Sequence, residues 1–456
     1  MAGIGFELRK MLRRNTLLGL MQAYAYAGLI SSGPWILSIV GMLVIGVLSL
    51  PFVLPTTLVE QFQVSVTYLI SLSLVLTGPL QLAFTRFASD RLFEKRDDLI
   101  LPNFHAVAFV VTMAAALVGG FAVWLLFPMQ TAGYRLLMLA GFAVVANIWI
   151  ATIFLSGMKQ YMSIIVVFMI GYSVTTGAAL ALNRYGLTGL MMGFVLGQTV
   201  LLAGLLALIY RDYRSDHFIS FEVFQKAHCY PTLMLTGLLY NLGIWIDKFM
   251  FWYAPGTGQQ VIGPLRASII YDIPVFLAYL AIIPGMAVFL LRIETDFVEC
   301  YEAFYDAVRE GASLQHIERT RNAMVEALRI GFWEIIKIQT IAALMLFAAG
   351  TAVLSWLQIS TLYLPLLYID VIAAGMQVLF MGVLNVFFYL DRRRIVVGLV
   401  GALVLLNAAL TGVTLALNPA WYGYGFAVSL LVVVLASLFL LDRKLGMLEY
   451  ETFMLQ

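Results

Sequence analysis

Twelve long apolar runs constrain the fold of this chain more than any other feature of its sequence. A membrane-spanning helix needs about 20 mostly apolar residues, and only 11% of the 456 residues are charged, against roughly 25% in soluble domains. The runs cover residues 22–50, 62–84, 103–128, 134–156, 161–182, 188–210, 231–253, 265–291, 330–357, 363–390, 395–417 and 423–441. The sequence therefore predicts an all-α polytopic membrane protein with twelve transmembrane helices.

The distribution of Lys and Arg predicts the orientation of these spans, because cytoplasmic loops carry an excess of both residues. If the N-terminus is inside, 22 of the 27 Lys and Arg fall on the cytoplasmic side, and only Arg135, Arg184 and Arg266 fall on the other. We therefore expect both termini in the cytoplasm. The first apolar run exceeds the roughly 7–15 residues of a cleavable signal core, so we expect the mature protein to keep it.

The two halves of the chain share a short motif that predicts an internal repeat. The sequence "SGPWIL" at residues 32–37 is similar to "LGIWID" at residues 242–247. Six spans separate these motifs, so the two halves would have the same orientation, a repeat arrangement found in transporters. We expect an N-terminal six-helix lobe at 1–210, a cytoplasmic linker at 211–230 and a pseudo-symmetric C-terminal six-helix lobe at 231–456.

The longest cytoplasmic loop, residues 292–329, interleaves aromatic, acidic and basic side chains with helical spacing. This pattern is typical of an amphipathic helix that lies at the membrane interface or in solvent and continues into the ninth span. The same surface is suited to docking a cytoplasmic partner. The sequence leaves both interpretations open.

Charged side chains in the middle of apolar runs are the leading functional candidates. A charge at the bilayer centre costs about 2.5–3.5 kcal/mol on the insertion scale, so such residues usually face the bundle interior or a wet cavity. Asp247 and Lys248 are adjacent in the seventh run. Neighbouring helical side chains diverge by about 100°, so we expect them not to neutralise each other. Tyr240 shares a helical stripe with Asp247, and Asn241 shares one with Lys248, which predicts a polar sector along a transport path.

Further transport-path candidates occur in the eighth, ninth and tenth runs. They are Asp272, Glu334, Lys337, Asp370 and Gln377. Glu334 and Lys337 have i, i+3 spacing, so we favour a structural ion pair between them. Four intramembrane acids against two lysines would favour cationic or neutral polar cargo. The hinge candidates are Pro34, Pro79 and Pro284, because proline removes a backbone hydrogen bond.

The sequence contains no recognisable enzyme signature. A P-loop, H-E-x-x-H, G-x-S-x-G and G-x-G-x-x-G before a helix are all absent. Cys229 and Cys300 lack metal-ligand spacing, and the four histidines are scattered. We therefore expect no catalytic residue, no metal site and no cofactor. The net charge of +2 gives no support for nucleic-acid binding.

Three stretches carry a resemblance to a known family: "MAGIGFELRKML", "AYAGLISSGPWILSI" and "YNLGIWIDKF". They resemble the PelG family of inner-membrane exopolysaccharide transporters, within the multidrug/oligosaccharidyl-lipid/polysaccharide (MOP) exporter superfamily. The resemblance implies export of Pel, a cationic polymer of galactosamine and N-acetylgalactosamine, during biofilm matrix production. It also implies a multi-pass protein of the bacterial inner membrane with three partners: a PelF-like cytosolic glycosyltransferase, a PelD-like cyclic-di-GMP receptor and a PelE-like membrane protein.

Two other functions are compatible with the sequence. One is a proton- or sodium-coupled exporter of small cationic drugs in the same superfamily. The other is a membrane scaffold for a polysaccharide synthase that itself transports nothing.

Overall fold

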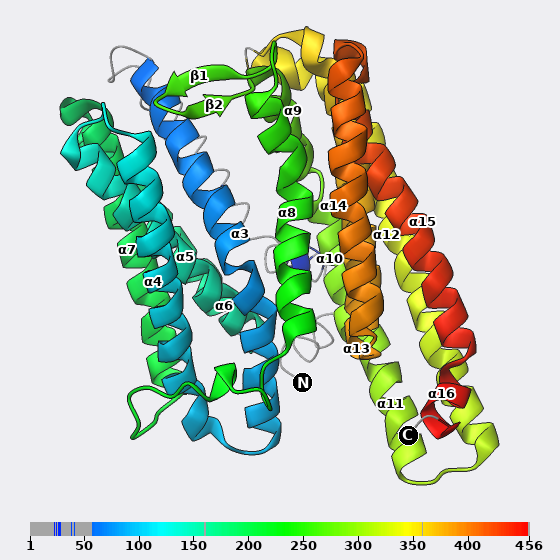
Figure 1. The fold of residues 1–456 in the computed structure, drawn as a ribbon. Helices are drawn as coiled ribbons and strands as arrows, with labels where there is room; N and C mark the ends of the chain where they lie inside the picture. The colour runs from blue at the N-terminus through cyan, green and yellow to red at the C-terminus, as the bar shows by residue number, and fades with distance from the viewer. Residues whose placement is uncertain are drawn as a thin grey trace. The chain divides into compact units, whose positions relative to one another are not determined.

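The computed structural model describes residues 57–158, 161–357 and 359–454, with residues 22, 24, 26–28, 38 and 41 before them. Pro34 and most of the predicted first span, 22–50, lie outside the described residues. The long helices are α3 Thr57–Phe93, α4 Ile100–Leu126, α5 Ala132–Gly157, α6 Tyr161–Ala181, α7 Gly186–Asp212, α8 Pro231–Tyr253, α9 Ile269–Leu280, α10 Ile283–Leu291, α11 Val298–Arg309, α12 Leu314–Trp356, α13 Leu364–Tyr389, α14 Arg393–Ala416 and α15 Tyr424–Gly446. A short helix, α16 Leu448–Met454, follows them, and two strands, β1 Gln259–Ile262 and β2 Leu265–Ala267, connect α8 to α9 (Figure 1).

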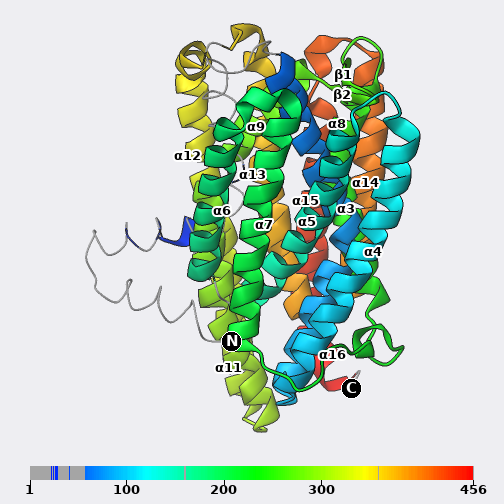
Figure 2. The ribbon, with the colours of Figure 1, turned by 90° about the vertical axis from the view of Figure 1, so that its left-hand side faces the viewer.

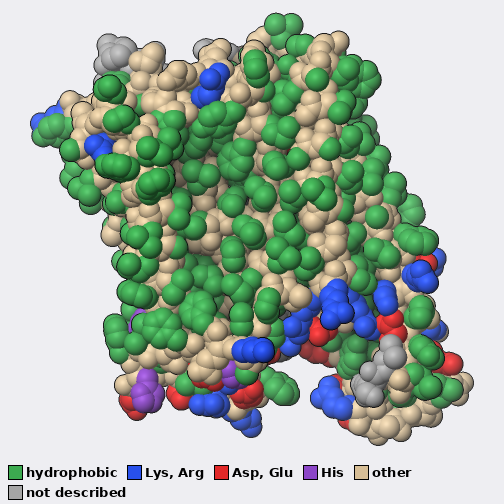
Figure 3. All heavy atoms as spheres, in the orientation of Figure 1, with side chains coloured by type: hydrophobic (Ala, Val, Ile, Leu, Met, Phe, Trp, Pro, Cys, Tyr) green, Lys and Arg blue, Asp and Glu red, His purple; other side chains and the backbone are tan. Residues whose placement is uncertain are grey.

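The helical membrane fold predicted from the apolar runs is confirmed, and hydrophobic side chains predominate over the middle of the face shown in Figure 3. Within the described part of the chain, ten helices are long and apolar enough to cross a membrane. Helix α8 is not among these ten, but it has the same bounds as the predicted seventh span, 231–253. Its polar residues, Asn241, Asp247 and Lys248 among them, lower its hydropathy.

The chain divides into two compact units. The first unit comprises residues 34–269, and the second comprises residues 270–456 together with 1–33. Helix α8 belongs to the first unit, where it packs along α3. The predicted lobe boundary at 211–230 concerns the sequence repeat and remains a prediction.

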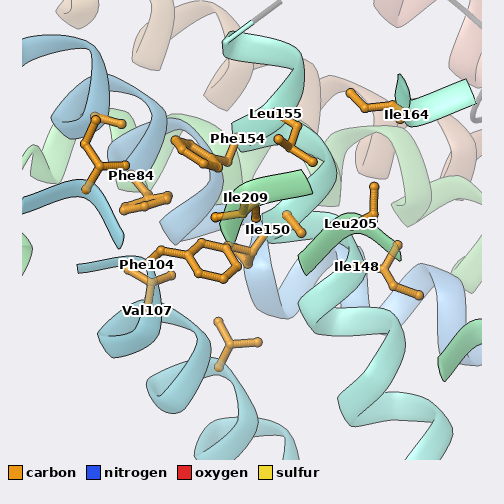
Figure 4. Packing of buried hydrophobic residues seen from close by; sticks show 14 of the residues in the cluster. Phe84, Phe104, Val107, Ile148, Ile150, Phe154, Leu155, Ile164, Leu205 and Ile209 are labelled. Carbon is orange, nitrogen blue, oxygen red and sulfur yellow. The ribbon is translucent and has the colours of Figure 1, made fainter. Parts of the chain in front are cut away.

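The first unit is held together by aromatic and aliphatic packing and by close glycine contacts. Phe84 of α3 lies 6.0 Å from Phe104 of α4 and 5.1 Å from Phe154 of α5, measured between ring centroids (Figure 4). Helices α6 and α7 run side by side (Figure 2). A Cβ on Gly193 would lie 2.3 Å from the backbone nitrogen of Ala179. Gly189, Gly193 and Gly197 of α7 recur every four residues, and each meets a neighbouring backbone at close range, so this repeat serves close helix packing.

The start of the predicted eighth span needs a correction. Residues 265–267, expected to be helical, form β2, which pairs antiparallel with β1, and helix α9 begins only at Ile269. The turn between the strands contains Gly263 at a φ of +53° followed by Pro264. A positive φ suits glycine, and proline cannot donate a backbone hydrogen bond, so this pair favours a hairpin turn over a helix.

The second unit contains the predicted amphipathic loop, which is helical. Helix α11 covers Val298–Arg309, and α12 continues without a break from Leu314 to Trp356, through the predicted ninth span. The expectation that this segment continues as a helix into that span is confirmed. Its role in docking a partner remains a prediction.

Candidate functional site

The candidate site is built where α8 crosses α3 in the first unit (Figure 1). The two helices meet at Gly78 and Gly237, where neither helix carries a side chain. A Cβ on Gly237 would lie 2.1 Å from the carbonyl oxygen of Gly78, and a Cβ on Gly78 would lie 2.7 Å from that of Gly237. Only glycine permits this approach, which brings the polar groups of the two helices within hydrogen-bonding distance.

Asn241 is the link between the two helices. Its Nδ2 donates to the carbonyl oxygen of Leu74 at 3.0 Å and to Oε1 of Gln81 at 3.3 Å. Gln81 in turn donates through Nε2 to Oγ1 of Thr77 at 2.8 Å. Asn241, one of the predicted transport-path residues, thus belongs to a hydrogen-bonded chain shared by α3 and α8.

The α3 side of this chain was not identified from the sequence. Ser73, Thr77, Gln81 and Thr85 recur every four residues, and the first three are buried. Ser73 accepts a hydrogen bond from Nε1 of Trp149 at 3.0 Å. The four-residue spacing was the available signal, because it places these side chains on one helical face. Uncharged polar residues add less to the free energy of membrane insertion than charges do, so they are a weaker sign of a functional site.

Asp247 and Lys248 form an ion pair, contrary to the expectation from their helical geometry. Nζ of Lys248 lies 3.1 Å from Oδ2 of Asp247 and donates to the carbonyl oxygen of Ile244 at 2.9 Å. The Cβ atoms diverge, but the long lysine stem folds back along its own helix and carries Nζ to the carboxylate. Both side chains also make further interactions.

The pair is buried, and one aromatic ring lies beside it. Asp247 is 0% and Lys248 is 3% exposed, and Nζ lies 6.0 Å from the ring centroid of Trp245. Desolvation opposes burying two charges, and their attraction offsets it only when both partners are present. The pair is therefore a place where removing one charge, or presenting a competing polar ligand, has a large energetic effect.

The other predicted transport-path residues are distributed over both units. Tyr240 is half-buried on α8, and Asp272 and Gln377 are half-buried on α9 and α13. Asp370 of α13 is 3% exposed, and a Cβ on Gly423 would lie 3.1 Å from its Oδ1. Each residue keeps its predicted role as a hypothesis.

The expected pairing of Glu334 with Lys337 is wrong. Glu334 binds Arg292 through two hydrogen bonds, Nε to Oε2 at 2.6 Å and Nη2 to Oε1 at 2.8 Å. Lys337 is exposed on α12. A bidentate Arg contact from a neighbouring helix is stronger than an i, i+3 pair on one surface. The count of four intramembrane acids against two lysines therefore left out Arg292, which neutralises Glu334.

Two predicted hinge prolines are described. Pro79 lies inside the continuous helix α3, next to Gly78 at the crossing. Pro284 follows a break between α9 and α10 at residues 281–282. A pocket of about 370 Å³ lies at this break, lined by apolar residues that include Pro284, Ala342 and Met345.

The predicted linker is docked onto the end of α3 in the first unit. Arg91 bonds Glu222 at 3.2 Å and approaches Nδ1 of His228 at 3.3 Å. Burial raises the pKa of Tyr230, and so does its hydrogen bond to Asp90. These contacts attach the linker to the C-terminal end of α3.

Solved structures of transporters have the same fold. An outward-facing multidrug resistance MATE transporter of the MOP superfamily aligns with a TM-score of 0.66 at 13% identity, over 93% of this chain and 96% of that one. A MOP superfamily transporter from Pyrococcus furiosus aligns at 0.65 with 11% identity, over 93% and 96%. A bent MATE conformation aligns at 0.64 with 12% identity, over 98% and 97%. The protein is thus a multi-pass membrane protein with the MOP transporter fold.

A family model narrows this class. The model described as "PelG: Putative exopolysaccharide Exporter (EPS-E)" matches residues 1–453. The chain belongs to the PelG family. Among curated proteins, none matches it.

Proposed function

We propose that this protein exports the Pel exopolysaccharide across the bacterial inner membrane, in concert with a PelF-like glycosyltransferase, a PelD-like cyclic-di-GMP receptor and a PelE-like membrane protein. Membership of an exopolysaccharide exporter family and the MOP transporter fold support this proposal. Both features favour a role in transport over catalysis.

The observation that carries the proposal is the buried polar chain along α3 and α8. Thr77, Gln81 and Asn241 offer hydroxyl and amide groups in an otherwise apolar bundle, and Asn241 lies seven residues, about 10 Å along α8, from Lys248 of the buried ion pair. Amides and hydroxyls both donate and accept, so they can exchange their mutual hydrogen bonds for bonds to sugar hydroxyls. Breaking the contact between α3 and α8 would expose these groups to a hydroxyl-rich cargo.

Reconstitution tests the proposal directly. The purified protein is placed in liposomes with the glycosyltransferase and its nucleotide-sugar donor outside, and polymer is measured in the lumen. We expect luminal polymer only when both proteins are present. Polymer that stays outside while synthesis depends on this chain would instead indicate a scaffold. Uptake of small cationic dyes without synthase, and no luminal polymer, would indicate a drug exporter.

A further inference from the structure

A six-residue π-helix, Arg292–Phe297, joins α10 to α11 in the second unit. Such wide turns are rare and frequently occur at functional sites. Here the turn directs nearby side chains to two different helices. Arg292 bonds Glu334 of α12 and also Asp296, at 2.6 Å, whereas Glu294 accepts hydrogen bonds from Asn385 and Tyr389 of α13.

Aromatic rings form the wall beside Glu294. Tyr389, whose hydroxyl donates to Oε2 of Glu294 at 3.0 Å, lies 5.5 Å from Tyr301 between ring centroids. The hydroxyl of Tyr301 donates to the carbonyl oxygen of Tyr389 at 2.9 Å, which fixes the two rings together. Glu294, Asn385 and both tyrosines are half-buried, so a ligand can reach them. Tyrosine faces attract cations and provide flat apolar area for the faces of sugar rings.

A buried amide lies further along the same helices. Gln339 of α12 is 9% exposed and lies beside Gly285 of α10 and Gly375 of α13. Within the described residues, its Nε2 has no hydrogen-bond partner. Helical side chains lean towards the N-terminus, which for Gln339 is the direction of Glu334 and the π-helix. A buried N–H donor in this state calls for an acceptor.

The charges and donors together specify the ligand. Arg292 pairs with Asp296 and Glu334, whereas Glu294 is bonded to the neutral Asn385 and Tyr389, so these described residues carry three acids against one arginine. A carboxylate beside tyrosine faces suits an ammonium group, and the Gln339 amide suits a hydroxyl or acetamido oxygen. Gly285, beside Gln339, and Arg292, at the start of the π-helix, are seven residues apart, about 10 Å along a helix. Successive sugar units can therefore meet the Gln339 amide and the Glu294 carboxylate.

We propose that Glu294, Asn385, Tyr301 and Tyr389, with Gln339 deeper in the bundle, form a binding subsite for an oligosaccharide that carries amino groups. This inference rests on the proposed function, because it supposes a sugar polymer as cargo. It places recognition of that polymer at the junction of α10 and α11, at the start of the 292–329 segment, for which the sequence suggested only an interfacial helix or the docking of a cytoplasmic partner.

Binding to the full-length protein in nanodiscs tests the subsite. Tetramers of galactosamine, unacetylated and fully N-acetylated, are titrated by calorimetry into wild type, Glu294→Gln, Tyr301→Leu and Gln339→Leu. We expect Glu294→Gln to weaken binding of the unacetylated tetramer about tenfold, as loss of a charged hydrogen bond does, with little change for the acetylated one. Tyr301→Leu and Gln339→Leu should weaken both. The matched control is Glu326→Gln, an exposed acid of α12.

The outcomes separate this inference from the proposed function. Equal affinities of wild type and the two Leu variants would overturn the subsite even if Glu294→Gln failed to fold. Wild-type protein that delivers polymer into liposomes but binds neither tetramer would also overturn the subsite, while the proposed function stands. Wild-type protein that binds the tetramers but delivers no polymer into the liposomes would contradict the proposed function and leave the subsite standing.

Discussion

Neutralising one member of the Asp247–Lys248 pair should cost far more than neutralising both. Asp247→Asn leaves the buried Lys248 ammonium with a neutral neighbour, and Lys248→Met leaves a buried carboxylate. Breaking a buried pair in this way costs about 3–5 kcal/mol, whereas replacing both partners is often neutral. Both side chains make further interactions, so we expect the double variant to recover at least half of the loss.

Thermal unfolding in detergent, followed by tryptophan fluorescence, measures this difference. For a unit of roughly this size, 1 kcal/mol shifts Tm by about 2–4 °C. Each single variant should therefore lose about 6–20 °C, and the double variant about half of that or less. Trp245, whose ring centroid lies 6.0 Å from Nζ of Lys248, is one of the tryptophans that contribute to this signal.

Two results would refute this reasoning. Additive losses in the double variant would mean that the charges act independently, and unchanged Tm in the single variants would mean that the pair is solvated. The export assay then adds a test of function. Under the proposed function, the double variant should stay impaired in polymer export despite its recovered stability, and full export by Asp247→Asn at equal protein level would remove Asp247 from the transport path.

Three further predictions concern other parts of the fold. Gly237→Ala should destabilise the first unit by about 1–3 kcal/mol, because its Cβ would lie 2.1 Å from a carbonyl oxygen. The control Gly177→Ala places its Cβ in open space and should leave Tm unchanged or raise it slightly. Equal Tm values for the two variants would contradict the close crossing. Glu451→Gln should speed hydrogen exchange in α16 about tenfold, because buried Glu451 binds two cations, and unchanged exchange would count against this anchoring. Burial, with nearby carboxylates, raises the pKa of Tyr213 to about 12. The contribution of this shift to stability is therefore complete below pH 10 and is lost as the pH rises towards 12. An alkaline absorbance titration in which Tyr213→Phe removes a tyrosine that ionises near pH 10 would contradict this prediction.

Much of the fold could be predicted because membrane insertion depends on local composition. The bounds of α8 agree with the apolar run at 231–253, and the helical segment at 314–356 continues through the predicted ninth span. The hairpin before α9 was missed because β1 and β2 have only four and three residues, and the first residues of an apolar run do not reveal whether they pair as strands.

The candidate site was predicted in part. Charges in an apolar run are conspicuous, so Asp247 and Lys248 were identified, but their contact depends on how the lysine stem bends. Serine, threonine and glutamine side chains occur in many apolar spans, so the sequence does not distinguish those of α3. Their role follows from the tertiary structure, which places Asn241 opposite them.

The membrane class, the bounds of most described spans to within a few residues and the presence of charge in α8 follow from the sequence, since hydropathy is a property of a single segment. Which helices face each other depends on the tertiary structure: α8 meets α3 at two glycines, Glu334 binds Arg292 and not Lys337, and a π-helix directs Glu294 to α13. The physical reason is that a partner is chosen by packing between distant segments, and local spacing does not encode that choice.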